Sequence, residues 1–345
     1  MNLKPLTSLR FFFAFMVMAS HLLFLKHSSY FKNFYDNYLF EGFLGVSFFY
    51  ILSEFILSLN YYELKPSKES FIKFYKARIA RIYPVHLITL IIAAILLVKN
   101  FSLKTFLMQL FLVQSFSSDQ KVYFSFNAPS WSISDELFFY LIFPLLIIIF
   151  RKLKTSAKTI LFLAITITIL GLNILLPESK KHYLIYIFPL SRLADFILGI
   201  LLFQICQFLR TKEIKSTTII LFQIIAVLSF VLTYIFHSDI SISYRFSIYY
   251  WLPISLTILS LSSEYYCQAE TLLTKILSNK ILVYLGQISF AFYMTHLLVI
   301  DILHLYFVIP NHIIKTGLII IITLTASIFN FEKVEKPANK LIKTL

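Results

Sequence analysis

The chain has 345 residues, of which 59% are hydrophobic and only 14% are charged, and its mean hydropathy is +0.80. Soluble domains are about 45–50% apolar and about 25% charged, so this chain cannot cover itself with polar groups and must use lipid as its solvent. The net charge of +14 would suggest nucleic acid in a soluble protein, but basic loops orient a membrane protein and contact anionic lipid, so we expect a lipid bilayer and no nucleic acid as partner.

Apolar runs of about 20 residues, enough to cross a hydrocarbon layer of about 30 Å, recur along the chain. They predict an all-α, polytopic membrane protein of about ten transmembrane helices. The stretch 103–116 is apolar but short, and we expect an interfacial or re-entrant helix there. The predicted spans are 6–26, 42–60, 82–98, 131–150, 159–176, 183–206, 217–236, 246–263, 283–305 and 313–331.

Lysine and arginine in alternate loops predict the orientation of these spans. If the N-terminus is cytoplasmic, the inner segments carry 20 basic residues and the outer segments carry 8. The remaining three, Arg10, Arg192 and Lys315, lie within spans. The bias places both termini inside. No loop is long enough for a soluble domain, so we expect residues 1–345 to form one membrane-embedded domain.

The first span carries Arg10 near its inner end and His21 near its outer end, 11 residues apart. On a continuous helix this spacing places both side chains on one face, about 16 Å apart along the axis. A charge inside a membrane helix costs about 2.5–3.5 kcal/mol on insertion scales. An arginine can instead extend to the headgroups, and His21 can be an interfacial histidine. Together on one face, the two residues favour a lined passage.

Basic side chains also precede the third span, where Lys76, Arg78 and Arg81 form an inner cluster. Such a cluster is commonly a topology signal, and it is equally suited to a polyanionic ligand. The fourth span begins with Trp131 and Ser132, and Glu136 follows Ser132 at i, i+4 on the same helical face.

Later spans carry further polar side chains. In the sixth, Arg192 and Asp195 are spaced i, i+3 and can neutralise each other, so a structural role is as plausible as a functional one. In the ninth, Tyr293 and His296 share one helical stripe with Ser289. No zinc-ligand cluster, P-loop or dinucleotide fingerprint occurs, and we expect no metal and no resident cofactor.

These residues form a series of short motifs in chain order. The motifs are Arg10 with His21, 45–55, 78–84, Trp131-Ser132 with Glu136 and Tyr140, 192–199, 286–296 and 335–337. Over nearly its whole length the chain thereby resembles acyltransferase family three, membrane proteins that O-acylate surface glycans and related acceptors. The chain departs from the family pattern at Glu54, where glycine is usual, and at Phe290, where tyrosine is usual.

The resemblance implies a membrane O-acyltransferase of the stand-alone form, without an appended soluble domain, in the cytoplasmic membrane. Its expected reaction transfers an acetyl group from cytoplasmic acetyl-CoA, or another acyl-CoA, to a hydroxyl of a surface or cell-envelope polysaccharide. CoA is polyanionic, so Arg10, Arg78 and Arg81 are the expected donor-binding residues.

A hydroxyl becomes a nucleophile when a base takes its proton, and His21 is the expected catalytic base. Glu136 is expected to orient its imidazole. The other residues expected to line the passage are Trp131, Ser132, Arg192, Tyr293 and His296.

Two other functions fit parts of the pattern. A transporter or flippase for a small solute or a lipid-linked sugar would also need a polar stripe through the membrane. A purely structural subunit would leave Arg10 and His21 on one face without an explanation. The ordered set of motifs favours the enzyme.

The loop charges predict the accessibility of single introduced cysteines. A cysteine within 26–41 should react with a membrane-impermeant thiol reagent added outside, and one within 65–76 should be protected until the membrane is opened. The reverse pattern would contradict the predicted orientation.

Overall fold

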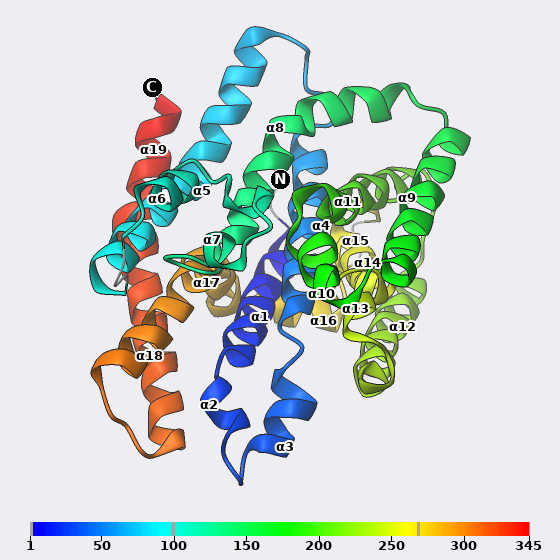
Figure 1. Cartoon of the computed structure of the whole chain (residues 1–345). Helices are drawn as coiled ribbons and strands as arrows, with labels where there is room; N and C mark the ends of the chain where they lie inside the picture. The colour runs from blue at the N-terminus through cyan, green and yellow to red at the C-terminus, as the bar shows by residue number, and fades with distance from the viewer. Residues whose placement is uncertain (1–2, 98–100, 268–269, 345) are drawn as a thin grey trace. The chain divides into compact units, whose positions relative to one another are not determined.

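Every regular element is a helix in the part of the chain that the computed structural model describes, residues 3–97, 101–267 and 270–344 (Figure 1). Within those residues, eight helical segments are long and apolar enough to cross a membrane. The predicted all-α, multi-pass membrane fold is confirmed. The eight segments are Lys32–Tyr61, Lys68–Leu96, Ser130–Lys152, Thr155–Leu175, Pro189–Leu209, Ser216–Ile235, Lys280–Tyr306 and His312–Ile342.

The other two predicted spans correspond to shorter helices. The first corresponds to α1 (Lys4–Ser20), which has 17 residues, and the eighth to the segment Ile248–Leu261. The number of ten spans and their orientation therefore stay predictions. The predicted end of the third span, residue 98, lies outside the described residues.

Two helices begin at places that differ from the predicted spans. Helix α5 (Lys68–Leu96) starts at a capping serine, Ser67, whose hydroxyl accepts a hydrogen bond from the Ser70 amide. The basic cluster around Arg78 therefore lies within the helix that forms the third span, not before it. In the sixth span, Pro189 begins α11 (Pro189–Leu209), because proline favours the first helical position.

The described residues divide into two compact units. Unit 1 takes those within Met1–Phe13, Phe43–Leu64 and Leu145–Gln287, and unit 2 those within Ala14–Gly42, Lys65–Pro144 and Ile288–Leu345. Three of the divisions fall inside α1, α8 (Ser130–Lys152) and α17 (Lys280–Tyr306), so these three helices contribute to both units. The single domain 1–345 stays a prediction.

Unit 1 is built on α4 (Phe43–Tyr61) packed against α11. Gly199 of α11 permits this packing: a Cβ there would lie 2.5 Å from the Ile51 carbonyl oxygen and 2.9 Å from the Phe55 amide nitrogen. The other helices of unit 1 are α9 (Thr155–Leu175), α10 (Glu178–Lys181), η3 (His182–Ile187), α12 (Ser216–Ile235), η4 (His237–Asp239), α13 (Ile242–Arg245), η5 (Ile248–Tyr250), α14 (Trp251–Leu261), α15 (Ser263–Tyr266) and α16 (Leu272–Leu277).

Unit 2 contains the C-terminal end of the chain. The C-terminal helix α19 (Lys336–Thr344) packs against α5, as the red and light-blue ribbons show in Figure 1. It follows α18 (His312–Asn330) through the π-helical turn η6 (Phe331–Glu335). The remaining helices of unit 2 are α2 (Leu23–Lys26), α3 (Lys32–Phe34), η1 (Tyr35–Leu39), α6 (Leu103–Leu110), η2 (Gln114–Phe116) and α7 (Gln120–Tyr123).

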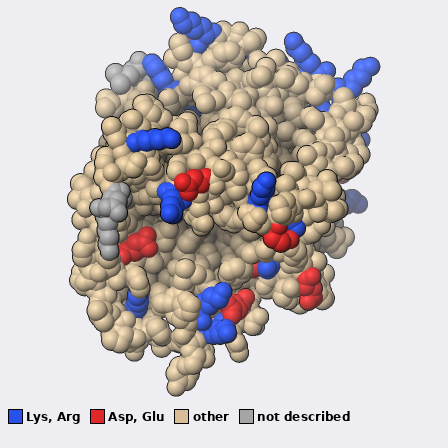
Figure 2. Space-filling model, viewed as in Figure 1, with Lys and Arg blue, Asp and Glu red and all other residues tan. Residues whose placement is uncertain are grey.

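The surface agrees with a lipid-embedded protein. Most of the face in Figure 2 is formed by residues that are neither basic nor acidic, and the charged side chains on it are sparse. Helix α9 exposes large apolar side chains along its length, including Leu163, Ile167 and Ile174. Lipid tails can cover such side chains where water cannot.

The packing of α4 against α11 predicts a matched pair of glycine variants. Gly199→Ala should lower the stability of the detergent-solubilised protein by about 1–3 kcal/mol, because the new methyl group meets backbone atoms that cannot move aside. Gly171→Ala, in the membrane helix α9, should leave it unchanged or slightly raised, since nothing lies within 4 Å of a Cβ there. Thermal unfolding followed by tryptophan fluorescence measures both, and equal melting temperatures would contradict the proposed role of Gly199.

Candidate active site

The candidate site starts where α1 ends. The helix ends at Ser20, and the His21 amide donates to the Met18 carbonyl at 3.0 Å, so His21 is the first residue beyond the helix. The Tyr35 hydroxyl donates to the Ser20 carbonyl. Gly42 lies so close that a Cβ there would be 2.0 Å from the Ser20 hydroxyl oxygen. These contacts hold the end of the helix, and with it His21, in one place.

The hydrogen bonds of the His21 imidazole identify its basic nitrogen. Nδ1 lies 2.7 Å from the Val17 carbonyl oxygen. A carbonyl oxygen only accepts, so Nδ1 carries the proton. The lone pair of the neutral ring is therefore on Nε2, which has no hydrogen-bond partner among the described residues. The side chain is half-buried. In this state His21 can take a proton at Nε2.

A second histidine lies against the first. His296, on α17, is fully buried, and its Nε2 lies 3.4 Å from Nδ1 of His21. Its own Nδ1 lies 2.6 Å from the Tyr293 carbonyl oxygen and donates to it. The Nε2 of neutral His296 is then an acceptor facing the Nδ1–H of His21, and the two ring centroids are 5.1 Å apart.

The start of α8 is fastened to the same stretch of α17. The hydroxyls of Ser132 and Tyr293 share a hydrogen bond of 2.8 Å, and Ser132 also donates to the Pro129 carbonyl at 2.9 Å. The Asn127 amide group donates to the Met294 carbonyl at 2.9 Å. These bonds connect two predicted passage residues, Ser132 and Tyr293.

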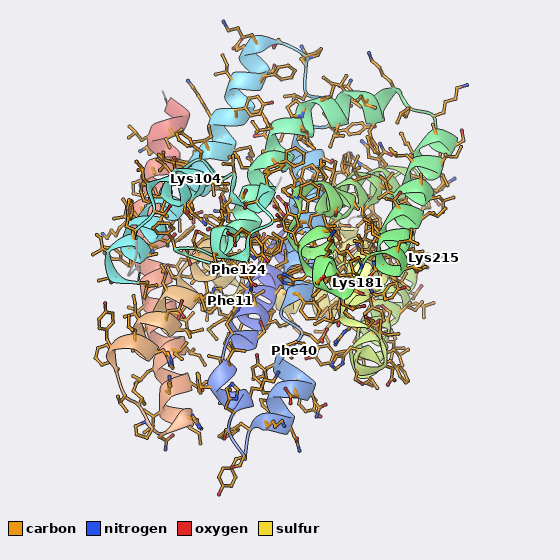
Figure 3. The ribbon with its side chains drawn as sticks, in the orientation of Figure 1. Phe11, Phe40, Lys104, Phe124, Lys181 and Lys215 are labelled. Carbon is orange, nitrogen blue, oxygen red and sulfur yellow. The ribbon has the colours of Figure 1, made fainter. Side chains whose placement is uncertain are left out.

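Two glutamines bind the segment before α8 to its first turn. The Ser130 hydroxyl donates to the Gln109 side chain at 2.8 Å, and the Gln114 side chain donates to the Ser130 carbonyl at 2.9 Å. Figure 3 draws the side chains of this segment and labels Lys104 and Phe124 within it. Burial raises the pKa of Tyr123, and the Asp119 carboxylate raises it further, so this phenol is neutral at physiological pH. The predicted short helix in this stretch is observed as α6, and its interfacial position stays a prediction.

This segment also holds strained backbone. Leu112 has a φ of 54° and Phe126 a φ of 57°, values in the left-handed region that are uncommon for residues other than glycine. Leu112 follows α6, and Phe126 precedes Asn127. Strain of this kind persists only where the surrounding contacts enforce it, and it concentrates at functional sites.

Glu136 belongs to a second group of contacts in unit 2. The Tyr140 hydroxyl donates to the Glu136 carboxylate. The guanidinium of Arg78 lies over the Tyr140 ring, 5.7 Å from its centroid. The described hydrogen bonds of His21 go to Val17 and His296, so orientation of His21 by Glu136 stays a prediction. Trp131 is buried at the start of the same helix.

Arg81 pairs with the C-terminal end of the chain. Its guanidinium forms an ion pair with Glu335, whose side chain is 2% exposed, and lies over the Phe290 ring at 5.5 Å. The Arg81 side chain itself is 23% exposed, so protein does not fully cover it. Glu335 of the terminal Glu-Lys-Pro motif thereby holds Arg81 in place, and the Phe290 ring contacts the same guanidinium.

Arg192 is wholly buried in unit 1. It forms an ion pair of 3.0 Å with Asp195 and donates to the Ser47 hydroxyl at 2.9 Å and to the Phe246 carbonyl. Asp195 also accepts from the Trp251 indole at 2.5 Å. This network neutralises both charges within unit 1, as the i, i+3 spacing allows. Its geometry favours a structural role, and passage lining by Arg192 stays a prediction.

Arg10 and Glu54 also belong to unit 1. Arg10 is half-buried on α1. The buried carboxylate of Glu54 accepts a hydrogen bond of 2.9 Å from the Ser58 hydroxyl. Eight of the ten predicted site residues therefore lie in unit 2, and the other two, Arg10 and Arg192, lie in unit 1.

Comparison with known proteins identifies the family. The family model described as an acyltransferase domain, that of acyltransferase family three, matches residues 5–329, nearly the whole chain. This chain belongs to acyltransferase family three. It is therefore an acyltransferase, and the predicted enzyme class is confirmed. No solved structure matches it.

Two relatives illustrate the range of the family. Acyltransferase MdmB of Streptomyces mycarofaciens is 28% identical over 327 residues, which cover 87% of this chain and 79% of the relative. A provisionally named O-acetyltransferase of Staphylococcus aureus (strain COL) is 26% identical over 290 residues, which cover 77% of this chain. The match spans 47% of that longer relative.

Several residues that support the site were not predicted from the sequence. Val17, Tyr35, Gly42 and Asn127 all position His21 or the helices beside it. Gly42 carried a usable signal, because a glycine beside a membrane helix often marks close approach of two backbones. Val17 acts through its backbone carbonyl, which every residue carries, and the partners of Tyr35 and Asn127 lie 15 and 167 positions away.

The two arginines of α5 should respond differently to replacement. We expect Arg78→Ala to raise the apparent KM for acetyl-CoA, the predicted donor, more than it lowers kcat, because the sequence predicts that this charge binds the donor. Arg81→Ala should do the same and also lower the melting temperature, since it leaves buried Glu335 unpaired. Glu335→Gln is the control: it should lower the melting temperature without the KM effect. An unchanged KM in Arg78→Ala and Arg81→Ala would contradict the prediction that these arginines bind the donor.

Proposed function

We propose that this acyltransferase is an O-acetyltransferase that moves an acetyl group from cytoplasmic acetyl-CoA to a hydroxyl of a cell-envelope polysaccharide, and that it resides in the cytoplasmic membrane. The free Nε2 of His21 carries the proposal, since a hydroxyl acceptor needs a base at that point. The name of the Staphylococcus aureus relative supports O-acetyl transfer.

The proton transfer can be written for this nitrogen. The acceptor hydroxyl gives its proton to His21 Nε2 as its oxygen attacks the acetyl carbonyl carbon. The bond from that carbon to the leaving group breaks, and the His21 imidazolium returns the proton to the leaving group, which is the CoA thiolate in direct transfer. The role of His21 is the same if the acetyl group passes first through a covalent acyl-enzyme intermediate. Either way the histidine ends the cycle neutral.

His296 is proposed as a positioning residue for His21. In serine hydrolases a carboxylate accepts from the Nδ1–H of the catalytic histidine and stabilises its positive charge. In this chain the acceptors beside Nδ1 are the Val17 carbonyl and the His296 Nε2. Both are neutral dipoles, so they fix the ring orientation and support the imidazolium without placing a second formal charge in the membrane.

The proposed donor site lies on the side of the membrane where the predicted loops carry most of the lysine and arginine. On the predicted topology Arg78 and Arg81 are near the cytoplasmic surface, where the phosphates of CoA arrive. Arg10 is proposed to add a third positive charge. Membership of an acyltransferase family favours this enzyme over the alternative, a transporter or flippase for a small solute or lipid-linked sugar.

Replacing His21 tests the proposal. His21→Gln keeps a hydrogen-bonding side chain but cannot take the proton, so transfer of labelled acetyl from acetyl-CoA to membrane glycan should fall by about 10²-fold or more. The matched control is His27→Gln, the same change at an exposed histidine six residues later, which should keep full activity. Near-normal turnover of His21→Gln would disprove the assignment.

The same assay distinguishes the proposed base, His21, from the proposed positioning residue, His296. His296→Gln should lower kcat less than His21→Gln does, because Nε2 of His21 remains free to take the proton. It should leave the KM for acetyl-CoA unchanged. A larger loss in His296→Gln than in His21→Gln would make His296 the base instead.

A further inference from the structure

Lys315 is a buried lysine at the start of a membrane helix. It is the fourth residue of α18 and is 8% exposed. Its ammonium group lies over the Phe24 ring, 4.8 Å from the centroid. Among the described residues it makes neither a hydrogen bond nor an ion pair. The proposed acetyl transfer does not use it.

The usual explanation for a lysine near a helix end does not fit this one. Such lysines extend their long side chains to reach the headgroups and water. Protein instead covers most of the Lys315 side chain, and only a small part of it remains accessible. The Phe24 ring stabilises the charge in part, yet no described residue supplies a counter-ion for this ammonium, and a charge at a membrane helix is unfavourable without one. A charge kept under these conditions points to an anion that binds there.

A second nitrogen donor is next to Lys315. The His312 ring, one turn earlier on α18, stacks on the same Phe24 ring with centroids 5.6 Å apart. Its Nδ1 is buried and has no hydrogen-bond partner among the described residues. The first free amides of α18, by contrast, are capped by the Asn311 side chain. The unused donors around Phe24 are therefore those of Lys315 and His312.

These donors lie beside the proposed catalytic base. Phe24 is on α2, three residues after His21, and all four residues belong to unit 2. Helices α2 (blue) and α18 (orange) are labelled in Figure 1. The ring of Phe24 on α2 contacts both His312 and Lys315 on α18. On the predicted topology this is the outer end of the membrane, the side from which a glycan acceptor would arrive.

We propose that Lys315 and His312 form a binding site for a phosphate group carried by the acceptor, as in a lipid-linked or phosphate-bearing glycan. The inference rests on the proposed function and specifies its substrate class. Lysine binds phosphate as a point charge with three donors, and Phe24 connects this site to His21. A phospholipid headgroup offers the same phosphate chemistry and is the other source.

The first experiment measures binding without catalysis. Glucose 1-phosphate should raise the melting temperature of the detergent-solubilised wild-type protein, and glucose at matched ionic strength should not. Lys315→Met should abolish the shift and Lys315→Arg should retain it. Lys32→Met removes an exposed positive charge from the same outer segment and should keep the shift. Lys315→Met should still fold, because it removes a buried charge.

The second experiment assigns the source of the phosphate. In nanodiscs, Lys315→Met should raise the KM for a phosphorylated glycan acceptor about tenfold. It should leave the KM for the dephosphorylated acceptor and for acetyl-CoA unchanged. If activity instead loses its dependence on phosphatidylglycerol content, the phosphate comes from lipid and the acceptor assignment is overturned.

Two results would have different meanings. If glucose 1-phosphate stabilises wild type and Lys315→Met equally, and neither KM nor lipid dependence changes, the phosphate site is disproved. If the wild-type protein transfers no acetyl group from acetyl-CoA, the proposed function fails. In that case a thermal shift that depends on Lys315 still supports an anion site at α18.

Discussion

The site depends on the hydrogen bond between the His21 ring and the Val17 carbonyl. In a continuing helix that carbonyl would accept from the His21 backbone amide, four residues on. Here the amide bonds to Met18 instead, and the imidazole takes its place at Val17. Histidine near a helix C-terminus is suited to this, because the last carbonyls have no amide partners. One bond thus helps to end the helix and leaves Nε2 as the basic nitrogen.

The surrounding structure secures this arrangement from several sides. Tyr35 and Gly42 hold the last turn of α1, and His296 supports the ring from α17. The start of α8 is in turn bonded to α17 through Ser132 and Tyr293. Because the residues come from three separate helices, small shifts in helix packing would alter the geometry at His21. Buried hydrogen bonds at these junctions limit such shifts.

The sequence predicted the helices well because hydropathy is a local property. Eight long apolar helices lie where apolar runs predicted spans, although α5 begins well before its apolar run because Ser67 caps a polar first half. The motifs also named His21, His296, Tyr293 and Ser132, but as separate residues. That His21 contacts His296 could not be read from the chain, since 275 positions separate them. The end of α1 at Ser20 is held by Tyr35 and Gly42. Both residues lie outside the predicted first span, so its sequence pattern could not reveal them.

The length of α5 sets the depth of the arginines on it. The helix has 29 residues and is therefore about 43 Å long, which exceeds a hydrocarbon layer of about 30 Å. Counted back from Leu96, Arg78 lies about 27 Å along the axis, close to the far boundary of that layer. A thicker bilayer would pull the guanidinium groups into hydrocarbon, whereas a thinner one would release them into the headgroups or tilt the helix. Because α5 must match the bilayer, the thickness of the membrane affects the depth at which the arginines of the proposed donor site lie.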